Sequence, residues 1–560
     1  MAAILYLDGT QVYPSGDQNI KLTRENPYFS LSGSYTLEVN MPMNILENRR
    51  FFGNICRMDV LKRHRTMTCR LLVDNKMLMN GTARITQVTD QDVKVQLLAG
   101  NSEINFLSED DALYIDELQY PAGRVMAREV TMYWDIMSFY GKATVPRLID
   151  IVTEVLRASG FTVTENFLDR EPWRNIYITT DQNDAAHFEK TLPHWKASEF
   201  IREISYLFNV TFKADAVTKN VRILSNISYV EDAQLTELDV LDEYKVEINE
   251  DSEDSGIVAL SNANIRYSLV SSEDNDMACL EDDVRNALET KEYDSFESLD
   301  QAWRTMPKEE RSCYVFACPQ GHYASWVGIP LAKDTPAEEK LTYIDCFRPL
   351  VRDSTNKDGE QELKIVPVGV HLWAQKFGAI IPYFYIHAPV VDGPADETVV
   401  DYEDEATEKI TVQDAVENGV DSSENASSDD VMQVMFVDGK EQLIIRQDVL
   451  GDKVNVLYGI AGFTDWLLKP GIDGTLHDRW SMSLNPTQAD HYIGELHHNS
   501  YSFNMDAKYC CSFISDVIPD PGDIFVFHGK HYACEKIEAN IKDGQLDRLM
   551  TGYFYEILPQ

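Results

Sequence analysis

The residues of this sequence best suited to metal chemistry are histidines, which gather near the end of the chain. Half of the twelve histidines fall after residue 470, namely His477, His491, His497, His498, His528 and His531. Imidazole nitrogens bind transition metals, so Asp490-His491 and His497-His498 could supply ligands if the fold brought them together. The alternative is that all six are ordinary strand and turn residues. The sequence leaves both open, and we assign no metal ligand.

The nine cysteines are odd in number and contain no Cys-x-x-Cys pair. Cys313 and Cys318, followed by His322, come nearest to a metal-ligand spacing, but no second pair completes a tetrahedral site. We therefore expect buried, reduced thiols.

No known catalytic motif appears in the chain. The nucleophile elbow, the phosphate-binding loop, the zinc-protease helix and the dinucleotide-binding glycines are all missing from the sequence. Trp373 with Tyr383, Phe384 and Tyr385 could form a platform for stacking sugars, or could be the core of a β-domain. We predict no catalytic residue, no cofactor and no enzyme.

The charge of the chain is strongly negative. Fifty Lys and Arg against 92 Asp and Glu give a formal charge of −42 over 560 residues. A field of this sign repels phosphate, which argues against general nucleic-acid binding. It fits either a solubility coat or a surface past which DNA slides without sticking.

One stretch reverses this balance. Seven basic residues lie within 22 positions: Arg49, Arg50, Arg57, Lys62, Arg63, Arg65 and Arg70. Such a cluster is either a solvated face or a surface that pairs with the acidic surface of a neighbouring subunit.

The composition predicts a folded chain of several domains. Apolar residues make up 44% and charged residues 25%, which is usual for globular proteins. The longest nearly apolar run, residues 378–386, is about half the length of a membrane-spanning helix. The first residues lack the basic start of a secretory signal. We therefore expect no membrane span, and synthesis and folding in the cytoplasm.

Both ends of the chain have the period-two alternation of β-strands. Ile4–Leu7, the turn Asp8-Gly9 and Val12 predict a hairpin, and Ser34–Met41 predicts a half-buried strand. Further strands are expected at Cys69–Val73, Ala83–Val88, Val93–Leu98, Ile524–Phe527 and Thr551–Leu558. A barrel or a sandwich is the expected result at each end.

The middle of the chain changes to a helix-then-strand rhythm. Thr144 is expected to cap a helix that Gly160 ends, and a strand, 161–165, follows. Ser198 is expected to cap a second helix that ends at Asn209, followed by paired strands at 210–213 and 221–224.

The predicted fold class is therefore multidomain α+β, mainly β, with β-barrel or sandwich domains at both ends and a small helix-strand module between them. The predicted segments are a β-domain at 1–130, a module with two helix-strand units at 131–250, a mixed α/β insertion at 251–385 with helices near 280–288 and 298–304, an acidic linker or insertion at 386–432, and a β-domain at 433–560.

Parts of the sequence resemble phage tail hub proteins. Thr191–Phe212, continuing to Val221–Leu224, is similar to the helix and strand pair of that family, and Pro146–Thr164 resembles its companion unit. Other stretches resemble large tail proteins of phages and prophages of Bacteroides-type bacteria: Arg24–Phe29, Tyr35–Val39, Phe52–Asn54, Arg57–Asp59, Pro519–Phe525, Tyr532–Cys534 and Gly552–Tyr555. These pieces cover about a third of the chain.

The resemblance implies a hub-like virion protein, a baseplate hub or tail tip. In such hubs two β-barrel domains pack around a three-fold axis as a homotrimeric ring that joins the tail tube to the spike and passes DNA. Tube, spike and tape-measure proteins are the implied partners, and the acidic lumen is not expected to bind DNA specifically. The alternatives are a receptor- or glycan-binding tail protein and a tail-associated cell-wall hydrolase.

Overall fold

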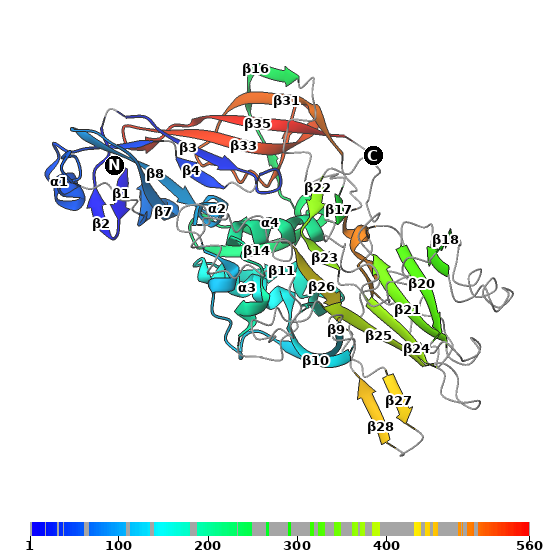
Figure 1. Cartoon of the computed structure of the whole chain (residues 1–560). Coiled ribbons are helices and arrows are strands. Elements are labelled where there is room, and N and C mark those ends of the chain that lie inside the picture. Colours follow the sequence, from blue (N-terminus) through cyan, green and yellow to red (C-terminus); the bar gives the residue numbers. More distant parts are fainter. Residues whose placement is uncertain are drawn as a thin grey trace.

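Figure 1 shows the computed structural model of the chain, which consists mostly of strands with a few short helices. The structure describes residues 3–16, 18–30, 33–36, 38–60, 66–107, 113–134, 139–179, 187–231, 233–248, 265–267, 289–292, 314–317, 323–330, 341–348, 361–367, 370–375, 384–391, 431–437, 443–447, 452–456, 480–482, 484, 490–497 and 502–558. The prediction of a mainly-β fold with several sheets is confirmed.

The largest sheet takes thirteen of its strands from the two ends of the chain, which appear blue and orange to red in the upper part of Figure 1, and two from residues 235–248. Its fifteen strands are β1 (Ile4–Leu7), β2 (Thr10–Val12), β3 (Ile20–Glu25), β4 (Ser34–Thr36), β5 (Val39–Pro42), β6 (Thr66–Val73), β7 (Lys76–Val88), β8 (Asp92–Ala99), β15 (Leu235–Glu237), β16 (Val240–Ile248), β31 (Ser502–Ile514), β32 (Ile524–Phe527), β33 (Lys530–Lys542), β34 (Gln545–Leu546) and β35 (Leu549–Leu558). The two halves join where β3 pairs antiparallel with β33, from Ile20 opposite Ile541 to Glu25 opposite Lys536. Among the described strands the order runs as an open path from β16 to β2.

Local sequence explains most strands of this sheet. In β6, alternate residues are buried, as a half-buried strand requires. The predicted hairpin is confirmed, because Asp8 and Gly9 have φ of 46° and 74°, the left-handed pair of a tight hairpin turn. The single strand expected over Ser34–Met41 is wrong: β4 and β5 are separate and pair with different parts of β8.

One apolar core lies against this sheet and is shared by the two ends. It contains Leu22 and Val95 from the first hundred residues, and Ile537 and Phe554 from the last thirty. The division of the chain into five consecutive domains stays a prediction. The strands of the first and last predicted segments nevertheless belong to one sheet and one core, and the described strands do not close into a barrel.

The middle module contains the two predicted helix-strand units. Its elements are α3 (Leu148–Ala158), β11 (Thr162–Asn166), α4 (Ala197–Phe208), β13 (Val210–Ala214), β14 (Asn220–Ser225) and α5 (Asn226–Glu231). Strand β14 pairs parallel with β11 and antiparallel with β13. The helices end as predicted, since Gly160 and Asn209 have left-handed φ of 85° and 47°.

The predicted starts of both helices are wrong. Arg147 and Lys196 are the N-caps, and neither makes a side-chain capping hydrogen bond. Thr144 lies inside a strand, opposite Glu129, and so cannot begin a helix. Ser198 falls inside the first turn of α4, because Lys196 is the residue held extended, in a bridge with Tyr114.

A second large sheet has eight strands. In order they are β10 (Phe139–Pro146), β9 (Ala127–Trp134), β25 (Phe384–Val391), β24 (Val370–Gln375), β21 (Leu341–Arg348), β20 (Tyr323–Pro330), β19 (Tyr314–Ala317) and β18 (Glu289–Glu292). Strand β25 crosses the predicted boundary at residue 385 and pairs parallel with β9 through Val390 and Val391, so strands of the predicted insertion and of the segment that enters the middle module belong to one sheet. The helices expected near 280–288 and 298–304, and the acidic stretch 392–430, lie outside the described residues.

The remaining described elements are short. Strand β26 (Met432–Phe436) lies between β12 (Ile176–Ile178) and β23 (Ile365–Pro367), and the two-stranded sheets are β17 (Ile265–Tyr267) with β22 (Gln361–Leu363), β27 (Leu443–Gln447) with β28 (Asp452–Val456), and β29 (Trp480–Ser481) with β30 (His491–Tyr492). The other helices are α1 (Leu46–Phe52), α2 (Asn101–Leu107), η1 (Ile115–Glu117), η3 (Phe167–Asp169), η4 (Trp173–Asn175), η5 (Phe188–Thr191) and η6 (Ile493–His497). No described helix has the length and apolarity needed to cross a membrane.

Candidate functional site: a buried junction of both chain ends and the middle module

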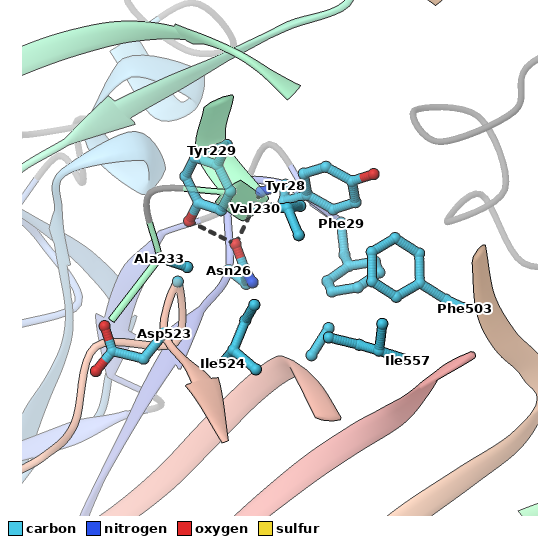
Figure 2. Close-up of a pocket in the computed structure, with 12 residues that line it drawn as sticks. Asn26, Tyr28, Phe29, Tyr229, Val230, Ala233, Phe503, Asp523, Ile524 and Ile557 are labelled. Carbon is cyan, nitrogen blue, oxygen red and sulfur yellow. Dashed lines mark hydrogen bonds between the residues drawn. The ribbon is translucent and has the colours of Figure 1, made fainter. Parts of the chain in front are cut away.

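Two loops and one helix, distant in sequence, meet at a small buried site that we call the junction (Figure 2). They are the loop 26–30 after β3, the loop 519–523 before β32, and α5. A cavity of about 20 Å³ lies between them. That space admits about one water molecule and is too small for an organic ligand. The junction is therefore a packed contact between segments.

Asn26 is the centre of the junction. Its side-chain amide donates to the carbonyl oxygens of Pro521 (2.9 Å) and Cys534 (2.8 Å). Its Oδ1 accepts from the Tyr28 N–H (3.0 Å) and from the Tyr229 hydroxyl (2.8 Å), as the dashed lines in Figure 2 show. Two donors and two acceptor positions are the full capacity of an asparagine amide. A residue only 3% exposed is thus fully hydrogen-bonded, to the N-terminal loop, the C-terminal sheet and α5.

Aromatic rings surround this amide. The Tyr28 ring stacks on the Tyr229 ring with centroids 5.8 Å apart, and the Phe29 ring lies 5.5 Å from the Tyr555 ring. Phe503 from β31 packs edge-on against both Tyr28 and Phe29. These rings give the hydrogen bonds of Asn26 an apolar, low-dielectric surrounding, in which a hydrogen bond is stronger than in water.

The loop 519–523 is shaped to fit against Tyr229. A Cβ added to Gly522 would lie 2.3 Å from the Tyr229 hydroxyl and 2.9 Å from Lys213 Nζ, so any larger residue there would require these side chains or the loop to move. Asp520 accepts from the Gly522 N–H at 2.9 Å and pairs with Lys213 at 2.7 Å. The loop is therefore held both by its own turn and by an ion pair to β13.

Burial governs the titration of the acidic groups here. Desolvation raises the pKa of the Tyr229 hydroxyl well above its ordinary value, and Asp520 and Asp523 add to that rise. Desolvation also raises the pKa of the Asp523 carboxyl, although its Oδ2 accepts from the Thr236 hydroxyl at 3.0 Å. A phenol held neutral and donating to Asn26 is a structural group rather than a nucleophile.

A second polar contact joins the N-terminal strands to the middle module. Glu103 of α2 is buried, and its Oε1 accepts from the Thr82 hydroxyl at 2.7 Å and from Lys219 Nζ at 2.9 Å. Nearby, the Asn101 Oδ1 accepts from the Ala214 N–H at 2.9 Å. These bonds hold the sheet of β7 and β8 against the loop between β13 and β14.

A third polar contact, made by a buried carboxylate, holds residues 361–367 to the middle module. Glu203 on α4 is 2% exposed, and its Oε2 accepts from the Lys364 N–H at 2.9 Å. Lys364 Nζ lies 2.6 Å from Oε1 of Glu199, one helical turn earlier. Desolvation raises the pKa of the Glu203 carboxyl, and the Lys364 N–H opposes that rise.

The histidines singled out by the sequence do not converge where they are described. His491 Nδ1 lies 2.9 Å from Glu495 Oε1, and His497 Nε2 lies 3.0 Å from the carbonyl oxygen of Leu207. His528 is in the turn before β33, and His531 is in β33 opposite Val526. His477 and His498 lie outside the described residues. In the described part of the chain, no three His, Cys, Asp or Glu side chains cluster as metal ligands would.

Cys69, Cys511 and Cys534 are buried free thiols. Desolvation raises the pKa of Cys69 to about 12 and of Cys511 to about 11, so these thiols are poor nucleophiles. Cys313, Cys318 and His322 lie outside the described residues. Trp373 falls in β24, opposite Ile344 and Ile386, and Phe384 and Tyr385 begin β25, whereas Tyr383 is not described. The sugar-stacking platform stays a prediction.

The role of Asn26 was not predicted from the sequence. The available signal was an Asn-Pro step between a strand and the aromatic pair Tyr28-Phe29, where an asparagine is held against apolar rings. Such a step looks like an ordinary turn, because nothing local shows that its partners are about 200 and 500 residues away.

No family model matches this chain, and no curated protein matches it. Among solved structures, the chain is similar to the 43 kDa tail protein of prophage MuSo2 from Shewanella oneidensis, with 8% identity over 99% of this chain and 96% of that chain and a TM-score of 0.33. It is also similar to the tail protein of Neisseria meningitidis MC58, with 7% identity over the same shares of the two chains and a TM-score of 0.32.

Proposed function

We propose that this chain is a structural protein of a phage tail, located in the virion at the baseplate hub or tail tip, and that it acts through interfaces rather than through a reaction. One observation carries the proposal. Four of the stretches that resemble large tail proteins meet at the junction, although they come from opposite ends of the chain. Asn26 binds the carbonyl oxygens of Pro521 and Cys534, and Phe29 packs against Tyr555.

A structural role is supported by what the junction does with its polar groups. Its hydrogen bonds and the Lys213–Asp520 ion pair link parts of the fold to one another. The cavity beside them has room for about one water. Such a site fixes the chain ends and the middle module relative to one another, and a rigid subunit is what a ring component of a tail requires.

The charge supports passage of DNA without binding. In the proposed homotrimeric ring, each copy brings a formal charge of −42 to the assembly. A lumen lined by such a chain repels phosphates and lets DNA move through. The proposed partners are the tail tube and the spike, which the ring joins, and the tape-measure protein.

The test is co-expression of the full chain with the tube protein and, separately, with the spike protein of the same phage. We expect both to be captured with the tagged chain and to persist at virion-like salt. An unrelated protein of similar size and net charge is the matched control for non-specific capture. Capture of neither protein, with the chain folded, overturns the proposal.

A further inference from the structure

Two surfaces of opposite charge lie at the two ends of the large sheet. The basic tip is α1 with the residues that follow it, 46–60, and it contacts β2, the last strand of the sheet order. The acidic edge is the described segment 233–248, which ends in β16, the first strand of that order. Figure 1 shows α1 and β16 well apart on the upper sheet.

Hydrogen bonds of Asn48 hold the basic tip to the strands beneath it. The buried Asn48 donates to the carbonyl oxygens of Tyr13 (2.8 Å) and Pro42 (3.0 Å) and accepts from the Tyr13 N–H (2.8 Å). Above this anchor, Arg49, Arg50 and Arg57 are exposed. Residues 46–60 contain Arg49, Arg50 and Arg57 against Glu47 and Asp59, and Arg57 pairs with Asp59 at 2.7 Å.

The tip also exposes apolar surface. Met58 is fully exposed and Leu46 is 51% exposed. Apolar side chains placed among arginines on a rigid base are typical of a protein interface, where aromatic or aliphatic contacts are surrounded by charge.

The acidic edge has the complementary features. Glu237 and Asp239 are exposed, and the sequence of segment 233–248 contains five Asp and Glu against one basic residue, Lys245. Leu235, Tyr244 and Ile248 are 62%, 61% and 74% exposed. Among the described strands β16 pairs with β31 and is the first strand of the sheet order, the position at which a sheet adds a further strand.

We infer that the basic tip of one copy docks on the acidic edge of a second copy of this chain. The inference rests on the proposed function and adds the contact through which the ring closes. The partner of the basic tip is a second copy of this chain, because the tip and the acidic edge are opposite in charge and both expose apolar side chains. The two surfaces also lie at opposite ends of one sheet, so they belong to different faces of each copy. Two different surfaces that meet head to tail repeat around a ring when the rotation closes.

Charge reversal in the full chain tests this contact, with association measured by sedimentation velocity over a range of concentrations. We expect the tip variant Arg50→Glu/Arg57→Glu and the edge variant Glu237→Lys/Asp239→Lys each to weaken self-association at least tenfold. A chain carrying all four substitutions should recover association, because it restores opposite charges across the contact. The control Lys190→Glu/Arg202→Glu makes the same change in net charge as the tip variant, but in the middle module, and should associate like wild type.

Each other outcome decides against the contact. A tip variant that associates like wild type, or a four-substitution chain that stays dissociated while circular dichroism shows it folded, overturns it. Binding of duplex DNA that is lost in the tip variant, with self-association unchanged, assigns the tip to DNA instead. A wild type that remains a monomer but captures the tube and spike proteins overturns the contact and the homotrimeric ring, and leaves the structural role in the tail in place. Capture of neither protein overturns both the contact and the structural role.

Discussion

The junction and the basic tip use polar side chains in opposite ways. At the junction, the Asn26 side chain is buried, and all four of its hydrogen bonds are made to other groups of this chain. At the tip, Arg50 is exposed on a helix of seven residues, and the neighbouring Arg49 is also exposed, although its Nε donates to the carbonyl oxygen of Met43 at 3.1 Å. The two regions therefore have different roles. Buried polar groups with all their hydrogen bonds made hold the two chain ends together, whereas exposed guanidinium groups are positioned to bind a second copy.

This contrast makes the two regions separable by mutation. Substitutions at the junction should lower the free energy of unfolding, because they leave buried groups without partners. Substitutions at the tip should leave folding nearly unchanged and alter association.

The largest effect is expected for Asn26→Ala. It removes four hydrogen bonds and leaves two buried carbonyls and the Tyr229 hydroxyl unpaired, so we expect a loss of about 3–5 kcal/mol in urea unfolding. Asn19→Ala is the matched control, since the Asn19 amide donates to Asn540 in an exposed position, and it should cost less than about 0.5 kcal/mol. Equal losses for both variants would contradict the account of the junction.

Gly522→Ala should have the next largest effect. The new methyl group would displace the Tyr229 hydroxyl from Asn26 or move the loop, at a cost of about 1–3 kcal/mol. Gly16→Ala is the control, because a Cβ there meets nothing within 4 Å and should be nearly neutral. Thermal unfolding of the two variants side by side measures the difference, and a neutral Gly522→Ala would show that the close approach is not needed.

Glu203 gives a smaller, pH-dependent effect. Burial raises its pKa in the folded state above the ordinary 4.5, so its favourable contribution is complete below that value and declines as the pH rises through the folded-state pKa. Glu203→Gln keeps an acceptor for the Lys364 N–H and removes the charge, which makes it the reference for this contribution.

Urea unfolding between pH 4 and pH 8 measures this contribution. The stability of wild type relative to Glu203→Gln should fall as the pH rises. A relative stability that rises with pH would mean that the carboxylate is stabilised by its neighbours rather than penalised by burial.

The smallest effect on folding is expected for Arg50→Glu. An exposed side chain on a short helix should change the free energy of unfolding by less than about 0.5 kcal/mol. Self-association should nevertheless weaken, and more so at low salt than at high salt, because the contact is electrostatic. A loss of stability as large as that of Gly522→Ala would remove the distinction between tip and junction.

Local pattern predicts local structure in this chain and little else. The Asp8-Gly9 hairpin, the ends of α3 and α4 and the pairing of β13 with β14 follow from turn residues and periodicity over ten to thirty positions. The pairing of β3 with β33 does not follow from local pattern, because the alternation of a strand does not specify which distant strand pairs with it. For the same reason the junction could not be predicted from the sequence, because its interacting residues lie hundreds of positions apart.

The helix starts failed for a related reason. Thr144 and Ser198 are good capping residues, but β10 holds Thr144 in its ladder, and the bridge to Tyr114 makes Lys196 the extended residue before α4. Tertiary pairing, which the local sequence does not encode, decided where each helix begins.

Native mass spectrometry of the full chain, at low and at virion-like ionic strength, tests the central claim most directly. The account predicts a particle of three copies, alone or on the co-expressed tube protein, that dissociates more readily as salt increases. A single-copy mass under every condition, with the tube protein present, would contradict it.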